Sequence, residues 1–282
     1  GTQSLLAVFA IERTLAALMP ERSWRWDAGV LLLLAAATSL PWFTGQMMAD
    51  VFTPILVLDL YLVAVERASL TRWTWLALLL LVCVAAASHY THIALSLGLV
   101  AVLAGTALVF GRPRLADLLP VTAAAGLAIL AILAANYAQR REIVLSPVGS
   151  VMLMGRLMEY GMAQDYLAGH CATEHYRICD YREELPATTD DFLWRDDSVL
   201  ARLGGFEGYR QEAAVLAPRI IRSAPLRLLG LAAVATARQF FSFATGAGLI
   251  SYGPSGAGIS VYRMITDFFP GERQEFLNAR QY

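Results

Sequence analysis

The chain has 282 residues, of which 57% are hydrophobic and 16% are charged, and its formal net charge is −1. This composition is typical of a membrane protein that also has one sizeable water-exposed region. All 22 basic residues are Arg, and a net charge so close to zero gives no reason to expect a nucleic-acid partner.

The first 138 residues consist of apolar segments separated by short loops. A membrane span needs about 20 mostly apolar residues, and several of these segments reach that length only when their flanks are counted. A soluble core helix would show a polar face every three to four residues, and Trp73–Ser88 shows none. We therefore expect an all-α fold with a polytopic transmembrane bundle over residues 1–138. The six expected spans lie in Ser4–Met19, Ala28–Pro41, Val51–Val65, Trp73–Ser88, Ile93–Phe110 and Leu118–Tyr137.

Charge alternates along the loops of this bundle. Pairs of Arg occur in Pro20–Asp27, Glu66–Arg72 and Gly111–Asp117, whereas Gly45–Ala49 and Ser88–His92 contain none. Basic loops stay on the cytoplasmic side of a membrane. The Lys-free, Ala-rich and Leu-rich sequence is typical of a GC-rich bacterial genome, so we expect a multi-pass protein of the bacterial inner membrane. Residues 139–282 are then periplasmic.

The expected periplasmic region reads as helices and loops. Val148–Leu167 and Tyr209–Ile221 have amphipathic helical patterns, and residues 186–191 form a turn or helix-cap cluster. Residues 226–244 are too polar to span easily, because Arg227 and Arg238 lie inside the window. We expect a helix in the membrane interface, with Arg side chains extending toward the headgroups. A glycine-rich loop at 246–258 lacks the form of a nucleotide-binding loop, and a short helix follows at Val261–Phe269.

Two of the three cysteines lie eight residues apart in this region. An oxidising compartment favours a disulfide between Cys171 and Cys179. The alternative is a metal site that adds His170 and His175, although the spacing matches no common zinc pattern. The third cysteine, Cys83, lies in an apolar segment and is expected to be packed there as a free thiol.

Three charged residues fall inside expected spans. Asp59 lies in the middle of Val51–Val65, and Glu12 and Arg13 lie in the first segment. Charged groups in a membrane are costly and normally face the bundle interior. One interpretation is that Asp59 or Glu12 pairs with Arg13 and fixes helix packing. The other is an ion or proton path.

Polar residues gather where two Arg-free loops meet the outer face. Asp50 follows one loop and is a candidate catalytic carboxylate, although it could also be a helix N-cap. Gln46 lies in the same loop. The other loop contributes His89, Tyr90 and His92. Imidazolium and phenol groups donate hydrogen bonds to phosphate, and a carboxylate accepts a proton or binds a metal. The pattern indicates a site for a phosphate-bearing lipid head, against the alternative of interfacial residues without a chemical role.

The run from Pro41 to Pro54, PWFTGQMMADVFTP, followed by Leu56–Val65, resembles the outer elbow of polytopic GT-C superfamily glycosyltransferases. The short loops, the SHYTH turn and the late outer domain are similar too, and the resemblance covers residues 1–138 by pattern. It implies a polyprenyl-phosphate sugar donor and transfer at the outer membrane face. That family places its catalytic acid on a large outer loop after the first membrane helix, and no such loop precedes the first segment here, so no catalytic base is carried over.

Three functions are therefore open. The first is a GT-C-like membrane glycosyltransferase, or a fragment of one, that binds a membrane lipid, namely a polyprenyl-phosphate sugar. No cofactor is required by the sequence, and a divalent metal is compatible with it. The second is a non-catalytic accessory or structural subunit in contact with other membrane subunits. The third is a transporter or flippase, in which Asp59 would be central.

Overall fold

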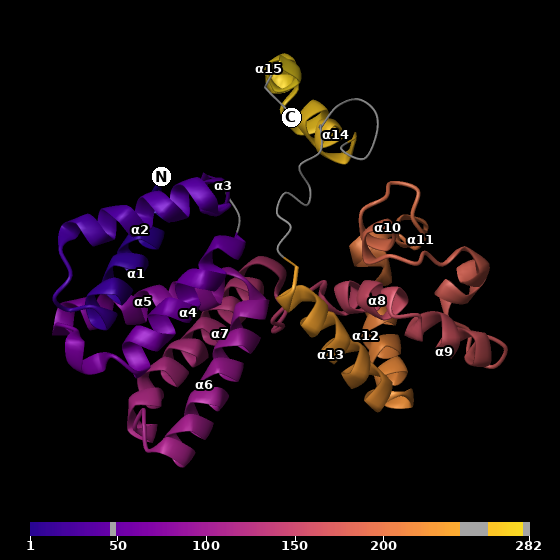
Figure 1. Cartoon of the computed structure of the whole chain (residues 1–282). Helices are drawn as coiled ribbons and strands as arrows, with labels where there is room; N and C mark the ends of the chain where they lie inside the picture. The colour runs from indigo at the N-terminus through magenta and orange to yellow at the C-terminus, as the bar shows by residue number, and fades with distance from the viewer. Residues whose placement is uncertain (46–48, 243–258, 279–282) are drawn as a thin grey trace. The chain divides into compact units, whose positions relative to one another are not determined.

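The computed structural model describes residues 1–45, 49–242 and 259–278, which form helices and connecting loops without any strand. The chain divides into two compact units, Gly1–Ser146 (unit 1) and Pro147–Tyr282 (unit 2), coloured indigo to magenta and pink to yellow in Figure 1. The division therefore lies a few residues after the expected boundary at 138. Gln46, the glycine-rich loop and the end of the 226–244 segment lie outside the described residues.

Unit 1 contains seven described α-helices and three short 3-10 helices. Proline, glycine and extended residues separate them, as at His89, whose extended backbone ends one helix before the next begins. The α-helices are α1 (Thr2–Leu18), α2 (Trp24–Ala37), α3 (Leu40–Gly45), α4 (Phe52–Ala64), α5 (Arg72–Ser88), α6 (Tyr90–Phe110) and α7 (Leu119–Arg140). The 3-10 helices are η1 (Ala49–Val51), η2 (Arg67–Ser69) and η3 (Leu115–Leu118).

The core of unit 1 lies among α4, α5 and α7. Its buried side chains include Leu56 and Leu60 of α4, Leu78 of α5 and Val121 of α7. Helix α5 packs against α4, α6 and α7, and α1 packs against α4. Small residues such as Ala85 lie at these contacts and let the helix backbones approach closely, which is how helices pack in a bilayer. Helix α2 has no buried residue.

Two segments of unit 1 are long and apolar enough to cross a membrane, α6 and the η3–α7 segment Leu115–Arg140. Only 17% and 28% of their most apolar windows are buried inside the structure, so most of their apolar side chains lie on the surface of unit 1. Helices α1, α2, α4 and α5 have 13 to 17 residues and reach about 20 to 26 Å, less than the hydrocarbon core. The full set of six spans thus stays a prediction.

Unit 2 is built from helices, and those that lie before residue 241 surround one core. In chain order these are α8 (Gly149–Glu159), α9 (Met162–His170), η4 (Arg177–Glu184), α10 (Thr189–Leu193), α11 (Val199–Arg202), α12 (Gly205–Ser223), α13 (Pro225–Phe240), α14 (Ile259–Phe268), η5 (Pro270–Glu272) and α15 (Arg273–Asn278). The amphipathic stretch expected as one helix over Val148–Leu167 is broken, because Gly161 adopts a left-handed conformation (φ 68°) between α8 and α9. The expected cap cluster is confirmed, since the Thr188 side chain accepts a hydrogen bond from Asp191 N–H (3.1 Å) at the start of α10.

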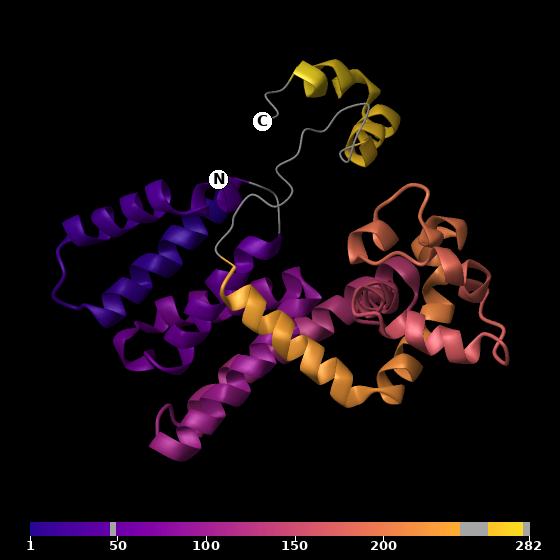
Figure 2. The same ribbon diagram turned by 45° about the vertical axis from the view of Figure 1, so that its right-hand side comes forward.

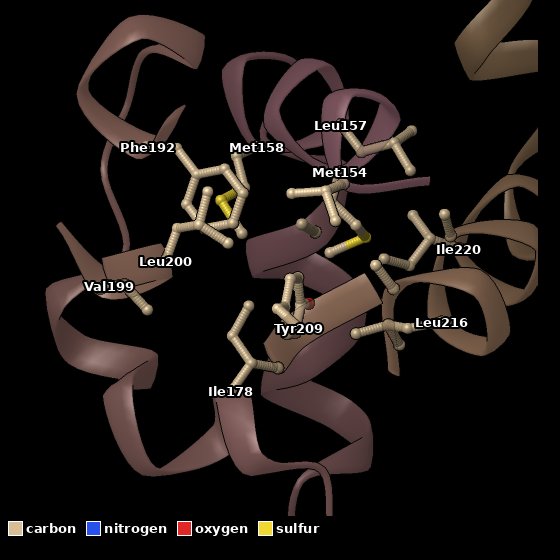
Figure 3. Close-up of a cluster of buried hydrophobic side chains, with 14 of the residues drawn as sticks. Met154, Leu157, Met158, Ile178, Phe192, Val199, Leu200, Tyr209, Leu216 and Ile220 are labelled. Carbon is tan, nitrogen blue, oxygen red and sulfur yellow. The ribbon is translucent and has the colours of Figure 1, made fainter. Parts of the chain in front are cut away.

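The core of unit 2 is formed mainly by apolar side chains, and it encloses the hydroxyl group of Tyr209. Figure 3 shows Tyr209 of α12 in the middle of the cluster, with Phe192 of α10, Ile178 of η4 and methionines of α8 around it. The Tyr209 and Phe192 rings meet edge to face with their centroids 6.1 Å apart, a favoured aromatic arrangement.

Helices α12 and α13 meet at a bend of 93° at Ala224, visible in orange in Figure 2. Together they would be long and apolar enough for one span, but α12 is amphipathic and buries its apolar face in the core of unit 2. The Arg227 guanidinium forms an ion pair with Asp165 and donates to the carbonyl of Tyr160 (3.4 Å), both within unit 2. The expected interfacial position of this segment stays a prediction.

Candidate functional site

The turn between α5 and α6 carries two of the predicted site residues on its surface. His89 has an extended backbone (φ −153°, ψ 132°) and caps α6, because its Nδ1 accepts from the backbone N–H of Thr91 (3.4 Å). In the neutral ring this hydrogen bond places the proton on Nε2, which is then the donor. The Tyr90 ring stacks on His89 with centroids 4.7 Å apart. The turn therefore presents an imidazole N–H and a phenol together.

His92 has a structural role instead. It is buried, its Nδ1 lies 2.8 Å from the carbonyl oxygen of Ala85, and its Nε2 lies 2.8 Å from the hydroxyl oxygen of Thr53. A carbonyl only accepts, so Nδ1 carries the proton, and in the neutral ring Nε2 accepts from the threonine. His92 thus ties α4, α5 and α6 together, and protein groups occupy both of its ring nitrogens.

Asp50 lies in η1, directly before α4. Its side chain is exposed, and α4 has Val51 rather than Asp50 as its N-cap residue, with no side-chain cap. The alternative that Asp50 caps the helix is therefore not what the structure shows. No contact joins Asp50 to either histidine in the described part of the chain. It is connected to the SHYTH turn through Thr53, one helical turn later, which contacts His92.

Two adjoining cavities lie beside these residues in unit 1. The first has a volume of about 560 Å³ and an almost wholly apolar lining from α1, α2 and α3: Ser4, Ala7, Val8, Ala28, Leu31, Leu32, Ala35, Leu40, Pro41 and Thr44. We call it the apolar slot. The second has a volume of about 550 Å³ and is lined by Gly1, Thr2, Gln3, Thr44, Gly45, Ala49, Phe52 and Ser88. We call it the elbow pocket.

The elbow pocket shares one lining residue with the slot and lies next to the predicted site. Thr44 lines both cavities. Ala49 and Ser88, which also line the elbow pocket, are the chain neighbours of Asp50 and His89. The structure therefore brings the chain neighbours of two predicted residues to one cavity, and this cavity shares Thr44 with the apolar slot. The side chains of Asp50 and His89 are not themselves among the lining residues.

The charged residues of α1 form a network that the sequence did not predict in full. Glu12 pairs with Arg13, as one interpretation proposed, and also with Arg22 at 3.1 Å. Arg22 pairs in addition with Asp27 and donates to the Glu12 carbonyl at 3.2 Å. Arg22 was assigned only to a basic loop. In the structure it is the centre of an ion network that fastens the end of α1 to the start of α2.

Asp59 does not belong to this network. It is completely buried in unit 1, and neither carboxylate oxygen has a hydrogen-bond partner among the described residues. The suggested pairing of Asp59 with Arg13 is thus absent, because Arg13 contacts Glu12. An ionised carboxylate without a partner is very costly in such surroundings, so we expect this group to be uncharged.

The two cysteines of unit 2 are paired as expected. Cys171 and Cys179 lie at disulfide distance with their Cα atoms 5.6 Å apart, and Cys83 is free. Within the described ranges, no group of three or more His, Cys, Asp or Glu side chains is placed to hold a metal ion, which removes the alternative with His170 and His175 there.

A network next to the disulfide holds its loop on α12. The Tyr176 hydroxyl donates to Glu174 and accepts from Arg219 at 2.7 Å. The hydrogen bond from Tyr176, together with the positive charge of Arg219, holds the pKa of the Glu174 carboxyl below its usual value, although partial desolvation opposes this. Burial and the hydrogen bond to Glu174 raise the pKa of Tyr176 to about 12.

Comparisons of the chain with protein-family models, with curated proteins and with solved structures give no match.

Proposed function

We propose that this chain is an integral membrane glycosyltransferase of the GT-C kind, or part of one, and that it uses a polyprenyl-phosphate sugar at the outer face of the bacterial inner membrane. The pair of adjoining cavities is the observation that supports this most. The apolar slot offers about 560 Å³ to a prenyl chain, and the elbow pocket offers about 550 Å³ to a sugar phosphate. Ligand cavities of a few hundred Å³ are usual for molecules of this size.

The proposed chemistry is a displacement at the anomeric carbon of the donor sugar. An acceptor hydroxyl oxygen forms the new bond to this carbon while the bond from the carbon to the phosphate oxygen breaks. Asp50 accepts the hydroxyl proton, and the phosphate leaves with the bonding electrons. The Nε2–H of His89 and the hydroxyl of Tyr90 donate to the phosphate, which gathers negative charge as it leaves.

The test is donor turnover by the purified full chain in nanodiscs, measured as release of polyprenyl phosphate from a synthetic polyprenyl-phosphate sugar. We expect Asp50→Asn to abolish turnover while donor binding persists, because the change removes charge at nearly constant volume. The matched control is Asp190→Asn, an exposed carboxylate of unit 2. Unchanged turnover in Asp50→Asn, or no turnover of any polyprenyl-phosphate sugar by the unmodified chain, would contradict the proposal.

The proposed topology has its own test. Ala116 lies in the loop assigned to the cytoplasm, and Ala187 lies in the region assigned to the periplasm; both are exposed. A membrane-impermeant maleimide added to intact cells should label Ala187→Cys and leave Ala116→Cys unlabelled until the cells are broken. The reverse pattern would invert the assignment.

One observation favours a second candidate, a proton-coupled transporter. A fully buried carboxyl group without a hydrogen-bond partner in the described residues is the kind of group that carries protons through membrane proteins. In that case Asp59→Asn would abolish proton-dependent uptake into proteoliposomes, whereas Asp50→Asn would leave it intact. If the chain is a transferase, Asp50→Asn should abolish its activity and Asp59→Asn should leave that activity intact.

A further inference from the structure

A third cavity lies in unit 2, between α8 and α13. It has a volume of about 590 Å³ and, unlike the apolar slot, a mixed lining. Its apolar part comes from α13. Its polar side chains are Arg156, Glu159, Tyr160, Arg238, Gln239 and Ser242. None of these residues belongs to the site proposed for sugar transfer.

The charges of this cavity suit an anion. Two guanidinium groups from two different helices line it, against one carboxylate. Arg156 pairs with Glu159 at 3.1 Å, and Glu159 also accepts from Thr189. Arg238 forms no ion pair with any residue that the structure describes. The lining therefore carries one uncompensated positive charge, and hydroxyl and amide donors surround it. Guanidinium groups bind phosphate through paired hydrogen bonds.

The opposite face of α13 indicates that the anion belongs to a membrane lipid. Leu226, Leu229, Ala233 and Phe240 recur at helical spacing on that face, and all four are exposed. Leu226 is 81% exposed and Phe240 is 76% exposed. An apolar helix face with basic residues on its other side is the pattern of a helix lying in a membrane surface, where anionic headgroups meet the basic side chains. Arg238 would then lie at the level of the headgroups.

We propose that the cavity between α8 and α13 binds the phosphate group of an anionic membrane lipid, while the exposed apolar face of α13 lies in the acyl region. Arg238 supplies the free guanidinium, and Arg156 turns from Glu159 toward the phosphate when the lipid enters. This site is separate from sugar transfer, so it stands whether or not the chain is a transferase.

The experiment measures retention of phosphatidic acid by the purified full chain, using native mass spectrometry after titration with phosphatidic acid or with phosphatidylcholine. We expect Arg238→Gln and Arg156→Gln each to weaken phosphatidic acid binding about tenfold, the loss of one charged hydrogen-bond donor. Arg238→Lys should lose less, since it keeps the charge. The matched control is Arg222→Gln, an exposed residue of α12 that does not line the cavity, and its binding should equal that of the unmodified chain.

Circular dichroism of each variant checks that the helices are intact. Equal binding of phosphatidylcholine and phosphatidic acid, or equal losses in Arg222→Gln and Arg238→Gln, would overturn the proposal. Calorimetric titration with inorganic phosphate distinguishes a site for a lipid headgroup from a site for free phosphate. If the chain binds inorganic phosphate as tightly as phosphatidic acid, and Arg238→Gln removes both, the anion site stands but its assignment to lipid is wrong.

Discussion

Removing the hydroxyl group from two tyrosines of unit 2 should change its stability in opposite directions. Tyr209 is fully buried, and its hydroxyl has no hydrogen-bond partner in the described part of the chain. The half-buried Tyr176 uses its hydroxyl twice, toward Glu174 and from Arg219. We therefore expect Tyr209→Phe to raise the free energy of unfolding of unit 2 and Tyr176→Phe to lower it.

The expected magnitude follows from the cost of burying polar groups. An unpaired hydroxyl in a protein interior costs about 1–3 kcal/mol by mutational measurements. Phenylalanine keeps the ring of Tyr209 and its edge-to-face contact with Phe192, so most of that cost should be recovered. Tyr176→Phe removes two hydrogen bonds to charged groups, a loss of about 1–3 kcal/mol. A change of 1.4 kcal/mol is a tenfold change in the opening equilibrium.

Hydrogen exchange followed by mass spectrometry reports this equilibrium for unit 2 alone, within the intact chain. The amides of α8 and α12 that exchange only on opening of the core should become slower in Tyr209→Phe and faster in Tyr176→Phe. Each variant controls for the other, because the chemical change is identical. If Tyr209→Phe loses protection as Tyr176→Phe does, then the Tyr209 hydroxyl has a partner in solution and the argument fails.

Three further predictions concern the pH response, two glycines and a helix contact. The pKa of Glu174 is lowered in the folded state, so the ionised carboxylate stabilises the folded protein fully above the unfolded pKa near 4.5. This stabilisation disappears as the pH falls through the lower folded pKa. Glu174→Gln should remove this part of the pH dependence of thermal unfolding. Gly208→Ala would place a methyl group 2.7 Å from a backbone carbonyl oxygen and should lower the free energy of unfolding by about 1–3 kcal/mol. A methyl group at Gly230 would meet no atom within 4 Å, so Gly230→Ala should raise the free energy of unfolding by about 0.5–1 kcal/mol. Denaturant titration measures both changes. Thr53→Val leaves the buried His92 ring without one hydrogen-bond partner. We expect this change to lower the free energy of unfolding of unit 1 by about 1–3 kcal/mol in thermal denaturation, and an unchanged transition would contradict the structural role of this contact.

The helical fold could be predicted from the sequence because apolar periodicity is a local property. The wholly apolar segment Trp73–Ser88 became α5 almost residue for residue, and the polar cluster before α10 became its cap. Helix interruptions were less predictable. Gly161 ends α8 within a stretch whose amphipathic pattern continues unbroken, because one left-handed residue changes the direction of the chain without changing the pattern.

Side-chain roles were the least predictable part. His89 and His92 have the same residue type in the same turn, yet one is a surface donor and the other a buried contact among three helices. The difference depends on Thr53, which is 39 residues away from His92 in sequence. Arg22 was likewise placed in a loop by its sequence, and its ion pairs with α1 appear only when the two helices are brought together. Pairwise contacts of this kind leave no signal in a single sequence.

The contact between His92 and Thr53 also has a mechanical consequence. Its hydrogen bonds join α4 to α5 and α6 where the elbow meets the SHYTH turn, in surroundings that contain little water to compete for them. Asp50 lies one turn before Thr53, and His89 lies one turn before His92. Because the hydrogen bonds of His92 hold α4, α5 and α6 to one another, we expect Asp50 and His89 to keep their spacing when any one of these helices moves.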